Sequence, residues 1–307
     1  MIAIILAKKI LSLFLIMIMG AALVKSKVLK ARDSKSISII TLYLVMPCVI
    51  ISSFQVTYTQ EIRDGLILAL IAAVLVHIIL IVLTEILGRM FRWDPVERAS
   101  SIYSNAGNLI IPIVTALLGK EWIIYTSAFL SVQLILLWSH GKMTLCGEKK
   151  IEFKKIATNV NMISIFIGIL FFICRIQLPA VLQDSIDTVG SMVGPAAMIV
   201  TGMLIGNMDL KKLASYKRLW LMVVIRLIAY PVLNIVLLKY SGLAAMVPAG
   251  DTILMITLLA TITPSASTIT QMAQVYGKDA DYASAINVAT TLLCIVTMPL
   301  MVMIYQL

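Results

Sequence analysis

The chain has 307 residues and a formal net charge of +10, and 61% of its residues are hydrophobic while 13% are charged. These charged groups are too few to cover the surface of a water-soluble protein of this length. Lipid must therefore surround most of the chain. The positive charge alone would suit nucleic-acid binding, but it is divided among separate loops, which indicates membrane topology and no nucleic-acid partner.

Ten segments approach the length of about 20 apolar residues that a membrane-spanning helix needs. They lie at residues 10–24, 37–54, 65–88, 99–118, 122–145, 159–177, 186–206, 219–238, 252–275 and 282–304. The predicted fold class is therefore all-α and integral to a membrane. The first segment also resembles a secretory signal, because Lys8 and Lys9 precede an apolar run that ends at Gly20-Ala21-Ala22. Cleavage there would leave nine spans.

Ten spans divide into two sets of five, and because five is odd, a duplicated half must enter the membrane in the opposite orientation. The sequence thus predicts a first inverted repeat at residues 1–146, a cytoplasmic linker at 147–158 and a second repeat at 159–307. Residue identity between the halves is weak. The predicted repeat rests on the number of spans and on prolines at matching places in the two halves.

The loops alternate in charge along the chain. One alternate set, which includes residues 25–36, 89–98 and 147–158, carries eighteen lysines and arginines, whereas the opposite flanks carry six. The positive-inside rule places the basic loops in the cytoplasm and both termini outside. This predicts a multi-pass protein of the cytoplasmic membrane.

Pro112 in the fourth segment and Pro264 in the ninth lie close to the membrane midplane. Each follows the start of its segment by roughly 18 to 20 Å, just beyond the middle of a hydrocarbon core about 30 Å thick. Proline lacks a backbone N–H and clashes with the carbonyl four residues earlier. Both residues are predicted to break their helices, the alternative being a simple kink.

Polar residues collect beside both predicted breaks. A broken helix exposes partial positive charge at the start of its second half, so two such helices could surround a buried anion with donors. Gly107 is expected to allow a close backbone approach where the helices cross. The alternative is that these polar residues only pack helices together. The predicted substrate-binding set is Asn105, Gly107, Asn108, Pro112, Pro264, Ser265, Ser267, Thr268 and Gln271.

Titratable residues are few inside the predicted spans, where each is costly and so a functional candidate. His77, Glu85 and Arg226 are the candidates for coupling. A Glu85–Arg226 pair is conceivable, because their spans correspond in the two repeats. Arg226 could instead snorkel to the cytoplasmic surface, and His77 could be a neutral packing residue.

Neither enzyme chemistry nor a cofactor is indicated. The sequence has no phosphate loop, HExxH motif or aspartate-rich cluster. A metal site is not expected, because there are only two histidines and the four cysteines are isolated.

The order of several short motifs resembles the auxin efflux carrier family, and in particular its bacterial malonate and malate permease-like branch. The likeness covers nearly the whole chain. Its markers are Gly20-Ala21-Ala22-Leu23, Leu42-Tyr43-Leu44-Val45-Met46-Pro47, Ser104-Asn105-Ala106-Gly107-Asn108 with Pro112, Val193-Gly194-Pro195-Ala196-Ala197, Pro264-Ser265-Ala266-Ser267, and Tyr276-Gly277-Lys278-Asp279 with Ala283-Ser284.

The resemblance implies ten helices in a five-plus-five inverted repeat, an architecture like that of sodium–proton antiporters and bile-acid symporters. The first, second, sixth and seventh helices would form a static scaffold, with a homodimer through them as one expected assembly. The broken fourth and ninth helices would carry the site. The long cytoplasmic loop of plant members is reduced here to about a dozen residues, which argues against phosphorylation control of that kind.

The sequence therefore predicts a secondary transporter of a small organic anion, a mono- or dicarboxylate such as malate or malonate, working by alternating access. Protons are the expected coupling ion, with His77 as one candidate carrier, while sodium held by carbonyls of the broken helices stays open. A membrane sensor that binds a carboxylate without net flux is the alternative function.

Overall fold

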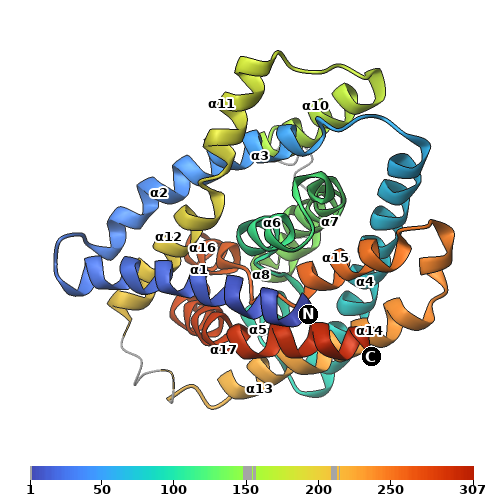
Figure 1. Cartoon of the computed structure of the whole chain (residues 1–307). Coiled ribbons are helices and arrows are strands. Elements are labelled where there is room, and N and C mark those ends of the chain that lie inside the picture. The colour runs from blue at the N-terminus through green and yellow to red at the C-terminus, as the bar shows by residue number, and fades with distance from the viewer. Residues whose placement is uncertain (1, 148–153, 155–156, 209–212, 214) are drawn as a thin grey trace.

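The computed structural model describes residues 2–147, 154, 157–208, 213 and 215–307, and every regular element in those ranges is a helix (Figure 1). Most of the predicted linker at 147–158 lies outside the described residues. The α-helices are α1 (Ile2–Lys25), α2 (Ser34–Ile40), α3 (Met46–Ser53), α4 (Gln60–Met90), α5 (Pro95–Ile102), α6 (Ala106–Leu117), α7 (Ile123–Leu136), α8 (Lys142–Cys146), α10 (Val160–Cys174), α11 (Ala180–Gly190), α12 (Val193–Asn207), α13 (Leu219–Val224), α14 (Tyr230–Tyr240), α15 (Gly250–Thr261), α16 (Ser267–Val275) and α17 (Ala280–Gln306).

Within the described part of the chain, six continuous helical stretches are long and apolar enough to cross a membrane. They are Ala31–Ser53, Gln60–Met90, Lys120–Leu145, Ala180–Asn207, Leu219–Tyr240 and Ala280–Gln306. The other four predicted spans contain shorter apolar helices at Ile10–Lys25, Ala106–Leu117, Val160–Cys174 and Gly250–Thr261. The protein is therefore a multi-pass helical membrane protein.

Helix α4 shows that lipid is the expected solvent of the outer surface. Leu68, Ala72 and Val76 are buried along one face. Ile78 and Val82 are each about half exposed on another face, at 52% and 50%. A helix that is apolar on both its packed and its exposed side fits a bilayer and not water.

Two prolines are accommodated by wide helical turns instead of breaks. A π-helical turn, Thr41–Val45, leads directly into α3, whose first turn contains Pro47. A second π-helical turn, Ile225–Ala229, leads into α14 and Pro231. Such turns shift the hydrogen-bonding pattern by one residue, which suits a position that has no N–H to donate. Both spans therefore continue through their prolines.

The fourth predicted span is interrupted, but not at Pro112. Helix α5 ends at Ile102 and α6 begins at Ala106, while Pro112 lies inside α6. The prediction of a break at Pro112 was therefore wrong by several residues. In the ninth span the interruption does fall at the proline, because α15 ends at Thr261 and α16 begins at Ser267, on either side of Pro264.

Helices α1 and α12 pack closely along each other (Figure 1). Gly202 and Gly206 of α12 are four residues apart and face α1, and a Cβ on Gly206 would lie 2.7 Å from the carbonyl oxygen of Ala21. A Cβ on Gly202 would overlap the carbonyl oxygen of Met17. Small residues at this spacing let two membrane helices bring their backbones together.

The helices pack into two groups. Helix α12 contacts α1 and α2, while α3 contacts α10 and α11, which lie together at the top of Figure 1. In the second group α4 packs on α7 and α15, and α13 packs on α17. Helix α6 contacts both α12 of the first group and α7 of the second. The C-terminal half of the fourth predicted span therefore lies at the boundary between the groups.

Candidate functional site

The two interruptions are joined to each other by their backbones. Ser104 and Ser265 form an isolated antiparallel β-bridge. The N–H of Asn105 donates to the carbonyl of Pro264 at 2.8 Å, and the N–H of Ala266 donates to the carbonyl of Tyr103 at 3.0 Å. Because α5, α6, α15 and α16 all begin or end here, four helix termini meet at one buried place.

A side-chain amide of a neighbouring helix satisfies the backbone of the first interruption. Gln133 of α7 accepts hydrogen bonds from the N–H of Ser104 at 3.1 Å and from its hydroxyl at 2.6 Å. The Nε2 of Gln133 donates to the carbonyl of Ser104 at 2.9 Å. The N–H and the carbonyl of Ser104 are thus both paired, as buried backbone groups require.

The second interruption is held in the same manner by α17. The N–H of Ser265 donates to the hydroxyl of Thr290 at 3.1 Å, and Nδ2 of Asn287 donates to the carbonyl of Ser265. The fifth and tenth predicted spans therefore each supply a carboxamide to the interruption in the span before them. These contacts, and not the prolines alone, position both breaks.

Arg226 lies at the carbonyl ends of both interrupted helices. The residue is 1% exposed, and its guanidinium donates to main-chain carbonyls at the end of α5 and at the end of α15. It does not snorkel, and it makes no pair with Glu85. Glu85 binds Arg98 instead, with 3.1 Å between the carboxylate and guanidinium, and has Arg89 at 3.9 Å. The pair of Glu85 and Arg226 that their corresponding spans would allow is therefore not formed.

The amide ends of α6 and α16 have no side-chain caps. Asn105, at the N-cap of α6, makes no capping hydrogen bond with its side chain, and neither does Ala266 at the N-cap of α16. Nδ2 of Asn108 donates to Oδ1 of Asn105 at 3.0 Å. The hydroxyl of Ser265 is fully buried and has no hydrogen-bond partner among the described residues. The N-terminal ends of α6 and α16 and the hydroxyl of Ser265 are therefore available to a ligand on the amide side of the breaks.

The remaining predicted site residues are not equally close to the breaks. Ser267 and Thr268 begin α16 and are half-buried, whereas Gln271 is exposed one turn later. Gly107 does not allow a close backbone approach, because a Cβ there would meet only the Cε of Met46, at 3.7 Å. The expectation for Gly107 was wrong because the helices meet three residues earlier, at Ser104.

His77 is buried in α4 with 1% of its surface exposed. Its Nδ1 lies 2.7 Å from the carbonyl oxygen of Ala73, and its ring packs 4.9 Å from the ring of Phe129. It also interacts with the side chain of Gln133, which grips the first interruption. His77 therefore lies next to the residue that positions Ser104.

A cavity of about 690 Å³ lies between the two helix groups. Pro112 is the one predicted site residue that lines the cavity, and Gly194, which also lines it, packs against Pro112. Lys120 and Asp187 both line the cavity and form an ion pair at 3.5 Å. Asp187 also accepts a hydrogen bond from Ser52. The cavity thus reaches α6 one turn beyond Asn108.

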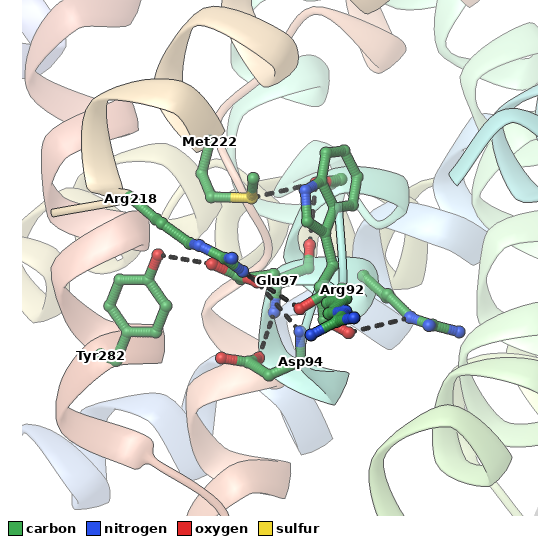
Figure 2. A network of polar contacts seen from close by, with 9 residues as sticks. Arg92, Asp94, Glu97, Arg218, Met222 and Tyr282 are labelled. Atoms are coloured by element: carbon green, nitrogen blue, oxygen red, sulfur yellow. Dashed lines mark hydrogen bonds and ion pairs between the residues drawn. The ribbon is translucent and has the colours of Figure 1, made fainter. Parts of the chain in front are cut away.

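A second polar cluster surrounds Glu97 at the other end of α5 (Figure 2). Glu97 is 1% exposed and forms a capping box with Asp94. Figure 2 shows Arg218 and Tyr282 converging on its carboxylate, at 3.3 Å and 3.2 Å. Arg218 also donates to the carbonyl of Arg92 at 3.1 Å. These contacts tie α5 to α17 and to the segment before α13.

Sequence reasoning missed Gln133, Asn287, Thr290 and Glu97. A usable signal existed for two of them, because Gln133 and Asn287 are the only carboxamide residues in the predicted spans 122–145 and 282–304. An amide in an apolar span needs a partner. Among the described residues, no group of three histidine, cysteine, aspartate or glutamate side chains is placed to hold a metal ion.

The helices and their apolar outer faces define an integral membrane protein. The chain belongs to the family described as Membrane transport protein, whose family model matches residues 5–153 and 148–302. This match supports the auxin efflux carrier family, which the motifs indicate, and a role in transport across a membrane. A comparison with curated protein sequences finds no match.

Proposed function

We propose that the chain is a secondary active transporter that moves a small organic anion, a mono- or dicarboxylate such as malate or malonate, across the cytoplasmic membrane by alternating access. The observation that carries the proposal is the meeting of two helix breaks whose amide ends are uncapped. Free N–H groups and the positive ends of helix dipoles favour an anion. Membership of a transport family supports the same conclusion.

The anion would bind on the amide side of the breaks. Asn105 and Asn108 lie at the start of α6, and Ser265 has a hydroxyl that has no partner in the described structure. Ser267 and Thr268 supply further hydroxyls at the start of α16. Ser265 is fully buried, so helices around it must move before a substrate reaches it. That requirement is the physical basis for alternating access.

A ten-span arrangement of two inverted repeats is part of the proposal. The two stretches matched by the family model divide the chain near its centre, at residues 148–153. Four shorter apolar helices account for the spans beyond the six long ones. The first helix group contains the first, second, sixth and seventh predicted spans, which suits them to be a scaffold and a dimer interface.

The orientation with basic loops inside and both termini outside has support from loop contacts. Arg218 lies against Arg92 and Glu97, and Lys142 lies over the ring of Tyr276 at 5.9 Å. These contacts join segments that the charge pattern assigns to the cytoplasm. In this orientation the cavity opens on the outside. Lys120 would attract an incoming carboxylate and exchange its ion pair with Asp187 for one with the substrate.

Replacing Asn108 by alanine should weaken carboxylate binding by about 1 to 3 kcal/mol, the usual loss for a hydrogen bond to a charged group. The measurement is the shift in unfolding temperature of the purified protein with increasing malonate or malate, compared with wild type. Asn207→Ala, at the exposed end of α12, is the matched control and should bind normally. Normal ligand shifts in both Asn105→Ala and Asn108→Ala would contradict the assignment.

Purified protein in lipid vesicles should take up labelled malonate or malate when a pH gradient is imposed without sodium. His77→Ala should reduce this proton-driven uptake more than it reduces ligand binding, because His77 is the proposed carrier. Ligand binding without flux would favour the sensor. Uptake that follows only a sodium gradient would refute proton coupling, and undiminished proton-driven uptake by His77→Ala would make Glu85 the next residue to test.

A further inference from the structure

Arg226 binds the carbonyl ends of both broken helices at once. Its Nη1 donates to the carbonyls of Ser101 at 3.1 Å and Ile102 at 3.4 Å, at the end of α5. Its Nη2 donates to the carbonyls of Thr261 at 2.8 Å and Thr263 at 2.9 Å, at the end of α15. One side chain of the eighth predicted span therefore bridges the fourth and ninth.

The charge of this buried guanidinium is balanced by the helix ends themselves. Arginine stays protonated in proteins, and among the described residues no carboxylate forms an ion pair with Arg226. Each helix C-terminus carries about half a negative elementary charge. Two such ends provide about one negative charge, which matches the single positive charge of the guanidinium. Four charge-assisted hydrogen bonds then offset the cost of burial.

Carbonyl oxygens at the ends of half-helices are also the ligands that coupling cations use in transporters with discontinuous helices. Here the guanidinium of Arg226, a cation that belongs to the protein itself, lies at the carbonyl ends of the half-helices. Its place between the two carbonyl ends is distinct from the amide ends, which are left for the anion. The two sides of the crossing thus have separate electrostatic roles.

We propose that Arg226 is a built-in cation that fixes the two helix breaks together and takes the place of a metal ion at their carbonyl ends. The fork of the guanidinium reaches four oxygens from two helices, which a lysine ammonium cannot match in geometry. It follows that binding at the amide side needs no sodium. This last consequence rests on the proposed carboxylate function, whereas the fixing of the breaks does not.

Chemical rescue tests the fixing role directly. Arg226→Ala in detergent should unfold several degrees below wild type, and millimolar guanidinium chloride should raise its unfolding temperature. Urea at the same concentration should not, and wild type should gain nothing from guanidinium. Arg89→Ala, which removes an 81% exposed arginine, should be neither destabilised nor rescued. A variant that is as stable as wild type, or is insensitive to guanidinium, would overturn the proposal.

Arg226→Lys covers the case in which the alanine variant does not fold. The lysine keeps one positive charge but lacks the forked guanidinium. The variant should therefore fold, and its unfolding temperature should lie below that of wild type. A lysine variant that equals wild type would refute the four-carbonyl clamp.

Sodium dependence separates this proposal from the carboxylate function. In wild type, the shift in unfolding temperature produced by malonate or malate should be the same in sodium chloride and in choline chloride. A shift that requires sodium would overturn the built-in cation. The absence of any shift with carboxylates would count against the proposed function, while the rescue result would still decide the role of Arg226.

Discussion

Gly202→Leu is expected to abolish the folded protein. Any side chain at residue 202 would enter the space of the Met17 carbonyl oxygen in α1, and a backbone atom cannot move aside as a flexible side chain can. Overpacking of a core typically costs about 1 to 3 kcal/mol, and separating α1 from α12 along their length should cost more. The measurement is the yield of monodisperse protein in size-exclusion chromatography after mild solubilisation.

Gly107→Ala is the matched control for this experiment. A Cβ at residue 107 would meet the Cε of Met46 only at ordinary contact distance, so the yield and the unfolding temperature should stay near those of wild type. If Gly202→Leu gave the same yield and unfolding temperature as wild type, the close packing of α1 on α12 would be wrong.

Gln133→Leu is expected to give the second large effect. The substitution keeps a similar volume but removes three hydrogen bonds to Ser104, leaving a buried N–H and a buried carbonyl without partners. Each unsatisfied group costs about 1 to 3 kcal/mol, so the free energy of unfolding should fall by about 2 to 6 kcal/mol. Thermal unfolding measures this loss, with Gln60→Leu at the exposed start of α4 as control.

Combining this variant with Asn287→Leu tests whether the two interruptions support each other. Both amides hold one paired bridge from opposite sides, so the double variant should lose less stability than the two single losses combined. Strict additivity would show that each interruption is held independently.

The sequence predicted the helical segments and the second interruption because both depend on local chemistry. Long apolar runs give membrane helices wherever they occur. Pro264 marked its interruption correctly, because a missing N–H acts on its own helix. The family motifs led to the same family that the family model matches.

The position of the first break could not be read from Pro112, because the break is fixed by tertiary partners. Ser104 is held by Gln133 and by the bridge to Ser265, so the helix opens there while Pro112 is tolerated inside α6. The role of Arg226 was hidden for the same reason. Its partners are main-chain carbonyls, which no side-chain pattern reveals.

The bridge between Ser104 and Ser265 also constrains how the chain can be made. During synthesis the fourth predicted span is made long before the ninth, so the N–H of Asn105 and the carbonyl of Tyr103 must wait for Pro264 and Ala266. Exposed backbone groups are unfavourable in hydrocarbon. The first half must therefore stay near the insertion machinery, or hold water at its opened turn, until the second half arrives. A truncated first half should behave as an unfinished nascent chain, not as an independent folding unit.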